Sequence, residues 1–160
     1  MIDWSQFLPD LIATFIGFLL ALSGERMYDK YKDWRESKEI AKLFIAELEN
    51  MSTIVVRTAN TSDKSWINPI KTPTWDSAVS SKSIALLARF SWYNKLFELY
   101  DAIKDYNSWH NLRTNLFFEG KQYDQISQSL LEASNGIITQ IDDLLLAMGN
   151  CLTKAGTTSK

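Results

Sequence analysis

The chain has few of the residues that build turn-rich folds, disulfide frameworks or metal sites. Its 160 residues include one cysteine, one histidine, three prolines and six glycines. The single cysteine, Cys151, excludes an intramolecular disulfide and suits a reducing compartment. So few prolines and glycines disfavour an all-β fold, which needs many tight turns, and favour helices.

An excess of one sign of charge is also lacking. Seventeen basic and nineteen acidic residues give a formal net charge of −2. Proteins that bind duplex nucleic acid usually carry a clear positive excess, so this partner is disfavoured, although a local pocket can still take a small anion. The apolar share of 46% and charged share of 22% are typical of a globular protein. Residues 25–160 are enough for one core.

Familiar catalytic motifs are absent from the sequence. His110 and Cys151 are far apart and lack the spacing of zinc ligands. There is no Glu-x-x-His pair, Gly-rich phosphate loop or Gly-x-Ser-x-Gly elbow. The nearest arginine before His110 is Arg89, too distant for the arginine–histidine pair of an HEPN-type ribonuclease. We therefore predict no enzyme activity, cofactor or metal site, and expect His110 and Cys151 to be packed structural residues.

The acidic residues form no evident acid/base couple. Asp142 and Asp143 are adjacent, and neighbours on a helix point about 100° apart. Glu47 and Glu49 are similarly close in sequence. We expect all four on solvated helix faces, which leaves an all-carboxylate metal site as the only enzymatic alternative.

One long apolar run lies near the N-terminus. No residue from Leu11 to Gly24 is charged, and its apolar side chains occupy every face of a helix, a pattern that suits lipid better than a small core. A spanning helix needs about 20 apolar residues, so the length is close to the minimum. We predict a membrane anchor over residues 1–24; a cleaved secretory signal and a buried core helix are the alternatives.

The charges that flank this run predict its orientation. The only charged residues before it are acidic, whereas a secretory signal begins with basic residues. Basic residues follow it closely: Arg26, Lys30, Lys32, Arg35 and Lys38. By the positive-inside rule, the chain crosses the inner (cytoplasmic) membrane once, with its N-terminus outside and the rest in the cytoplasm.

Small residues recur on one side of the predicted anchor. Ala13, Gly17 and Ala21 are spaced by four, which lets two helix backbones approach closely in lipid. A short span also favours association, because oligomerisation relieves hydrophobic mismatch. We therefore expect a homo-oligomer.

After the anchor the sequence predicts an all-α fold, in which the transmembrane helix continues into a stalk and an antiparallel helical bundle. Residues 25–39 form the charged stalk, residues 40–152 the cytosolic bundle and residues 153–160 a flexible tail. The first core-facing stripe recurs at four- and three-residue steps as far as Ala59: Ile40, Phe44, Leu48, Met51 and Val55. Polar residues and two prolines then break the helix over residues 60–73.

Four further helices complete the predicted bundle. The first begins at Thr72 or Thr74 and ends at Ser81, with Trp75, Ala78 and Val79 inward; a second short helix covers residues 83–90. Ser91 caps a long helix that Gly120 ends, with the stripe Leu96, Leu99, Ile103, Tyr106, His110 and Phe117. The last apolar stripe keeps its phase across Asn135-Gly136 and so predicts one continuous helix. Its residues are Ile126, Leu130, Ile137, Ile141, Leu144, Met148 and Leu152.

The best candidate for ligand binding is the group Trp109, His110 and Arg113, with Asn107 and Asn111 beside it. A tryptophan can stack on a base and an arginine can hold a phosphate, as in single-stranded nucleotide binding. The alternative is that the tryptophan fills a helical or subunit seam and the arginine forms a salt bridge there. A weaker second candidate is the group Arg89, Trp92 and Lys95.

The layout resembles small prokaryotic proteins of uncharacterised function that begin with one membrane helix and a charged stalk. The resemblance is carried by a Glu-Leu-x-x-Asn-like element at Glu47-Leu48-Glu49-Asn50 and a Thr-x-x-Trp-like turn at Thr72-Pro73-Thr74-Trp75. In architecture it is also similar to CRISPR-associated membrane effectors, some of which bind a cyclic oligoadenylate and then perturb the membrane. This similarity implies an oligomeric effector in antiviral defence that senses a protein or cyclic oligonucleotide; a passive membrane tether or scaffold is the alternative.

Overall fold

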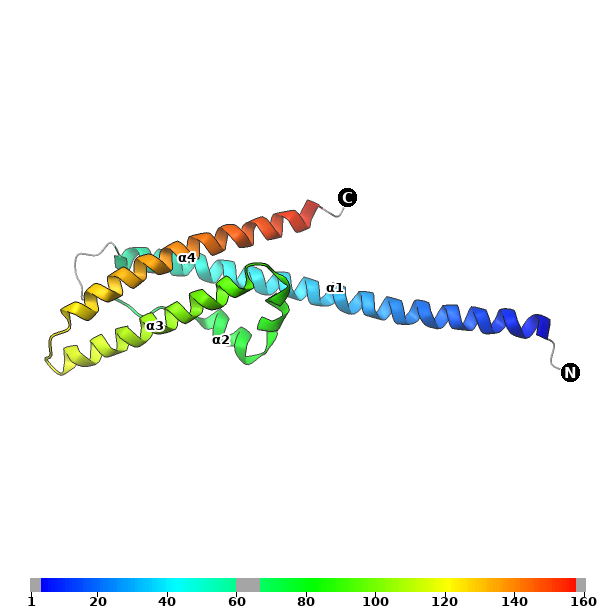
Figure 1. Cartoon of the computed structure of the whole chain (residues 1–160), viewed down its shortest axis with the longest axis horizontal. Helices are drawn as coiled ribbons and strands as arrows, with labels where there is room; N and C mark the ends of the chain where they lie inside the picture. Colours follow the sequence, from blue (N-terminus) through cyan, green and yellow to red (C-terminus); the bar gives the residue numbers. More distant parts are fainter. Residues whose placement is uncertain (1–3, 60–66, 158–160) are drawn as a thin grey trace. The chain divides into compact units, whose positions relative to one another are not determined.

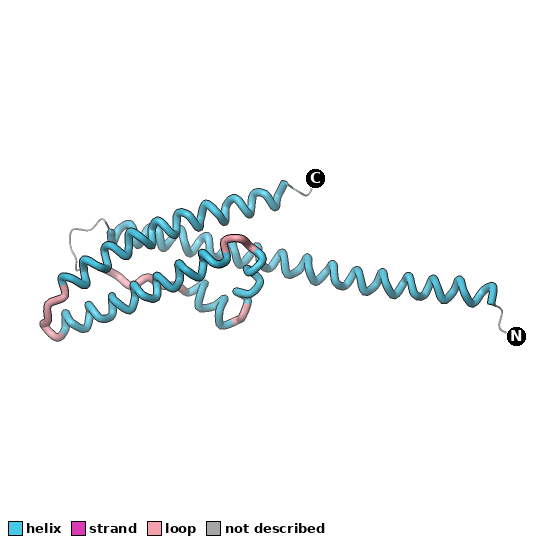
Figure 2. The backbone as a smooth tube through the Cα atoms, viewed as in Figure 1, coloured by secondary structure: helices cyan, strands magenta, loops and turns pink. Residues whose placement is uncertain are grey.

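The computed structural model describes the backbone of residues 4–59 and 67–157, and the side chains of residue 9 and of residues 11–57 and 67–151. The described part is entirely helical apart from its loops, which confirms the all-α prediction (Figures 1 and 2). Its elements are α1 (Trp4–Ala59), α2 (Pro73–Ser80), the 3-10 helix η2 (Ser83–Arg89), α3 (Tyr93–Phe118) and α4 (Asp124–Thr157). The chain divides into two compact units, Met1–Ser37 and Lys38–Lys160.

The first unit contains the apolar beginning of α1. This helix is long and apolar enough to cross a membrane, and none of its most apolar stretch is buried. Its large apolar side chains are exposed on all sides: Leu11, Ile12, Phe15, Ile16, Phe18, Leu19, Leu20 and Leu22. A helix in the core of a soluble domain is instead mostly buried.

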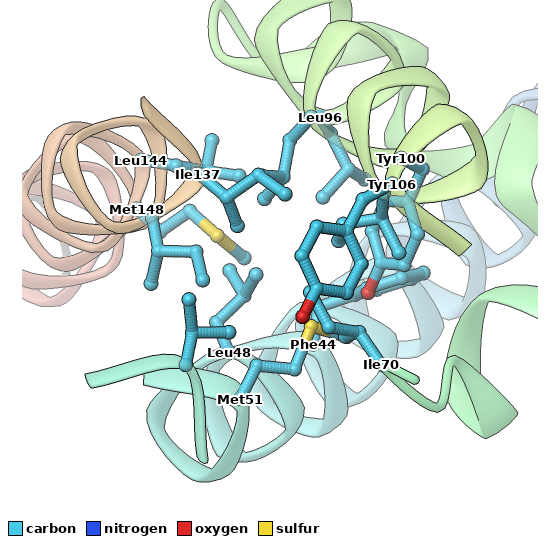
Figure 3. Packing of buried hydrophobic residues seen from close by; sticks show 14 of the residues in the cluster. Phe44, Leu48, Met51, Ile70, Leu96, Tyr100, Tyr106, Ile137, Leu144 and Met148 are labelled. Carbon is cyan, nitrogen blue, oxygen red and sulfur yellow. The ribbon is translucent and has the colours of Figure 1, made fainter. Parts of the chain in front are cut away.

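In the second unit the last part of α1 packs against the C-terminal helices around one core (Figure 3). Each long helix supplies one apolar stripe, as predicted. α1 contributes Phe44, Leu48, Met51 and Val55; α3 contributes Leu96, Leu99, Ile103 and Tyr106; α4 contributes Leu130, Ile137, Ile141, Leu144 and Met148, all at most 2% exposed. Ile70 joins this core from the loop before α2.

The order of the helices explains their directions. The short connection between α3 and α4 makes them antiparallel neighbours, and α4 also runs opposite to α1 (Figure 1). α3 runs in the same direction as the second-unit part of α1, and α2 and η2 lie between the two helices in the chain. α1 and α3 are therefore parallel to each other, and α4 is antiparallel to both.

The end of α3 has the structure that its glycine predicts. Gly120 has a φ of +66°, a conformation that costs glycine least. The Lys121 N–H donates to the Leu116 carbonyl at 2.9 Å, and the Gly120 N–H donates to the Phe117 carbonyl at 3.1 Å. This pair of bonds is a Schellman motif, which satisfies the last carbonyls of the helix.

Three details of the predicted helices are wrong. Trp92, not Ser91, precedes α3, and the Tyr93 N–H already bonds the Phe90 carbonyl, so no serine cap is needed. Val79 is 45% exposed, because the buried side of the short α2 is occupied by Ala78. Phe117 is 55% exposed; it lies beyond the core and contacts Phe118 and Tyr123 at the hairpin end instead.

α4 is one helix through Asn135 and Gly136, as its unbroken stripe predicts. It extends to Thr157, past the expected end at residue 152. The side chains of residues 152–160, which include Leu152 and the predicted tail, lie outside the described residues.

Candidate functional site

The three residues predicted to bind a ligand differ in their exposure to solvent. Trp109 is 50% exposed, Arg113 is 7% exposed, and His110 is half-buried between these extremes. All three lie on α3; Trp109 and Arg113 are four residues apart and so lie only about 40° apart around the helix, whereas His110 lies about 100° from Trp109. The Arg113 side chain bonds to Ser127 of α4, whereas the Trp109 side chain is exposed.

Arg113 joins the two arms of the α3–α4 hairpin. Its Nε donates a hydrogen bond to the Ser127 hydroxyl at 2.8 Å. Its guanidinium carbon lies 5.2 Å from the centroid of the Tyr123 ring, within the range of a cation–π contact. Ser127 is fully buried and its own hydroxyl donates to the Tyr123 carbonyl. Arg113 thus connects α3 to α4 through a hydrogen bond and a ring contact.

His110 connects α3 to the loop that precedes α2 by a hydrogen bond. Its Nε2 lies 3.0 Å from the Ile67 carbonyl, and because a carbonyl only accepts, Nε2 must carry a proton. Its Nδ1 is buried and has no hydrogen-bond partner among the residues that the structure describes. Asn107 adds two bonds to the same loop, since its side chain accepts from the Ile70 N–H and donates to the Ile70 carbonyl, both at 2.8 Å.

A small pocket lies beside these groups. Its volume is about 240 Å³, and its described lining is Ile67, His110, Arg113, Thr114, Phe117, Phe118 and Tyr123. The structure therefore brings His110 and Arg113 to one cavity, and Trp109 is not part of that lining. Pockets for whole small molecules usually measure roughly 300–1,000 Å³, so this cavity has room for one group of a larger ligand.

The second candidate group does not form a binding surface. Trp92 is only 2% exposed, and its ring stacks on Phe90 with centroids 4.9 Å apart. Arg89 and Lys95 are exposed. A base could not stack on Trp92, because the protein already covers almost all of its ring.

Sequence reasoning missed a buried and hydrogen-bonded carboxyl group of the second unit, that of Glu47. We expected a solvated carboxyl, but Glu47 is 8% exposed. One carboxyl oxygen accepts a hydrogen bond from the Thr74 N–H, and the other accepts one from the Tyr100 hydroxyl. Thr74 lies in the first turn of α2, where backbone N–H groups lack helical partners and favour an acidic group. The signal in the sequence was the position of Glu47 beside Leu48 on the apolar stripe of α1.

Aromatic rings surround this carboxyl group. Trp75 stacks on Tyr100 with centroids 4.3 Å apart and an interplanar angle of 11°. Phe44 contacts both rings edge-on. The two short motifs that carry the family resemblance, at residues 47–50 and 72–75, therefore meet in space through the bond from Thr74 to Glu47.

A larger polar pocket adjoins this cluster. Its volume is about 360 Å³, and its lining is Thr72, Trp75, Asp76, Tyr100, Asp101, Ile103, Lys104, Asn107, Ser108 and Asn111. It contains two carboxyl groups and one amine. This charge balance is unfavourable for a polyphosphate, so an anionic ligand fits better beside Arg113.

Two buried tyrosines have raised pKa values. Burial, then the hydrogen bond to Glu47 and the negative charges of Glu47 and Asp76, raise the pKa of Tyr100 above its usual 10.0. Burial raises the pKa of Tyr106 to about 12, against a smaller lowering effect of Arg113. The Tyr106 hydroxyl donates to the Asn68 carbonyl at 3.1 Å.

We predict a loss of stability at high pH from these two groups. The folded state holds both phenols protonated, so their contribution to the free energy of unfolding is complete below the unfolded pKa of 10.0. This contribution is lost as the pH rises through the pKa values of the folded state, about 12 for Tyr106. Tyrosinate absorbance and near-ultraviolet circular dichroism, followed from pH 9 upward, should show the last ionisation together with unfolding. The double variant Tyr100→Phe/Tyr106→Phe should lack this last absorbance phase; its persistence would contradict the assignment.

No group of three or more metal-ligating side chains occurs among the described residues. Comparison of the chain with protein-family models, with curated proteins and with solved structures found no match.

Proposed function

We propose that the chain is a single-pass membrane protein, with its N-terminus outside and its helical bundle in the cytoplasm, that works as an oligomeric effector. In this proposal the bundle senses a protein or nucleotide signal and the anchor helices perturb the membrane, in antiviral defence. The observation that carries the anchor is the exposed apolar stretch of α1, since its length and composition suit a span and none of it is buried.

The signal-binding part of the proposal rests on the pocket beside Arg113. A buried guanidinium and a histidine side by side suit a phosphate or carboxylate group. The cavity takes one such group, so the rest of a nucleotide or protein ligand would lie over the exposed side chains nearby, among them Phe117 and Phe118.

The competing function is a passive tether that holds a cytosolic protein at the membrane. It is favoured by the intramolecular contacts of Arg113, His110 and Asn107, which give these residues structural roles. The two functions differ in what they demand of the anchor: an effector needs its own helix, whereas a tether needs only attachment.

Exchange of the anchor separates these functions. Residues 1–24 are replaced by an unrelated single-pass helix of the same orientation, and growth and dye entry are measured in cells that express either chain. The effector proposal expects toxicity and dye entry from the natural chain and their loss after exchange. A toxic exchanged chain would contradict it and support the tether.

We predict that charge in the apolar stretch abolishes membrane insertion. A lysine near the centre of a span costs about 2.5–3.5 kcal/mol, so Ile16→Lys/Leu19→Lys should move the chain from the alkali-resistant membrane fraction to the soluble or aggregated fraction. Met27→Lys, placed beyond the stretch, is the matched control and should leave fractionation unchanged. Retention of the double variant in the membrane would contradict the proposed span.

A further inference from the structure

The polar pocket between α2 and α3 carries more negative than positive charge on its lining. Its volume of about 360 Å³ lies within the usual range of small-molecule sites, roughly 300–1,000 Å³. Asp76 of α2 and Asp101 of α3 each place a carboxyl group there, and Lys104 is the one basic residue in the described lining. These three side chains leave one negative charge in excess.

The two carboxyl groups keep their charge in the folded bundle. Among the residues that the structure describes, no ion pair joins Asp76, Asp101 or Lys104 to another side chain. Asp76 accepts a hydrogen bond from the Thr72 hydroxyl at 3.2 Å, and a hydroxyl brings no compensating charge. The pocket is therefore short of a cation.

A further carboxyl group lies behind the pocket wall. Tyr100 belongs to the lining, and its hydroxyl donates a hydrogen bond to the buried Glu47. The negative charges of Glu47 and Asp76 both raise the pKa of Tyr100, so both act at this wall. Because water screens a buried charge less than an exposed one, Glu47 adds to the negative potential that an occupant of the pocket meets.

Apolar surface lies beside these charges. Trp75 lines the pocket and is half-buried, and its ring is held by stacking on Tyr100 at a centroid distance of 4.3 Å. A methylene chain gains free energy when it leaves water for such a surface, whereas a hydrated metal ion does not. Carboxyl groups on two helices with an apolar wall beside them therefore suit an aliphatic amine better than a metal ion.

We propose that this pocket binds a linear aliphatic polyamine. Its ammonium groups meet Asp76 and Asp101, and its methylene chain lies along Trp75. The inference is independent of the proposed function, which places an anionic group beside Arg113. Because the amine contacts both α2 and α3, its binding should also raise the temperature at which the bundle unfolds.

Spermidine binding to the full chain in a neutral detergent tests the site. Isothermal titration calorimetry is run at constant ionic strength, so that general charge screening is the same in every titration. Two comparison ligands are used: butylamine has a methylene chain but one ammonium group, and the magnesium ion has two charges but no methylene chain. We expect spermidine to bind at least about threefold more tightly than either.

Variants of the lining should change the affinity in opposite directions. Asp76→Asn and Asp101→Asn should each weaken spermidine binding about twofold to fivefold, since each removes one charge pair. Lys104→Gln should strengthen it, because a competing ammonium group is gone. Asp142→Asn is the matched control: Asp142 is exposed on α4, outside the lining, and its loss should leave the affinity unchanged. Circular dichroism checks that each variant is folded.

Four results would overturn the proposal. They are no measurable binding of spermidine, magnesium binding as tight as that of spermidine, equal weakening by Asp142→Asn and Asp101→Asn, and weaker binding after Lys104→Gln. Equal weakening would mean attraction to the protein surface in general, and tight magnesium binding would assign the site to a metal ion. None of these results changes the membrane fractionation that tests the anchor.

Discussion

The variant Glu47→Ala is expected to lower the free energy of unfolding by about 3–4 kcal/mol. Its carboxyl group accepts hydrogen bonds from the Thr74 N–H and the Tyr100 hydroxyl in a site that water reaches poorly. Truncation leaves the buried Tyr100 hydroxyl and the half-buried Thr74 N–H without these acceptors. The measurement is chemical denaturation of the full chain in detergent, followed by tryptophan fluorescence.

Glu49→Ala is the matched control, because Glu49 is on the same helix two residues away but exposed. It should change the free energy of unfolding by less than about 0.5 kcal/mol. Glu47→Gln keeps the shape and one acceptor oxygen and should fall between the two. Equal effects of Glu47→Ala and Glu49→Ala would mean that Glu47 is solvated, as the sequence alone predicted.

The variant Phe44→Ala is expected to cost about 3–5 kcal/mol. Phe44 is fully buried, and its ring contacts Trp75 and Tyr100 edge-on at centroid distances of 6.5 and 6.0 Å. The preceding residue is the control: Leu43 is 59% exposed, and Leu43→Ala should cost less than about 1 kcal/mol. The same denaturation experiment applies, and a larger loss for Leu43→Ala would show that α1 is rotated relative to the structure described here.

The sequence predicted the long helices well because each has a sustained apolar period. The stripes through Leu48, Ile103 and Ile141 are buried as expected, and Gly120 ends α3 as its freedom of φ suggests. Asn135 and Gly136 did not interrupt α4, since burial of a continuous stripe outweighs a local cost of about 1 kcal/mol for glycine. Periodicity over many residues was the reliable signal.

Contacts between residues distant in sequence could not be predicted in the same way. Glu47 lies 53 residues before Tyr100, and no local pattern reports that a helix N-terminus and a phenol converge on it. The different burial of Trp109, His110 and Arg113 could not be predicted for a related reason: it depends on which elements pack beside α3. Only the packing of α4 shows that Arg113 is buried and Trp109 is not.

The core of the second unit also determines when the protein can finish folding. Phe44, Leu48 and Met51 emerge early from the ribosome, but their partners on α4, such as Ile141 and Met148, are made roughly ninety residues later. Between these two events only α2 and α3, through residues such as Trp75 and Tyr100, can cover the apolar side of α1. The part of the core that faces α4 therefore stays open in the nascent chain until α4 has been synthesised and can close the bundle.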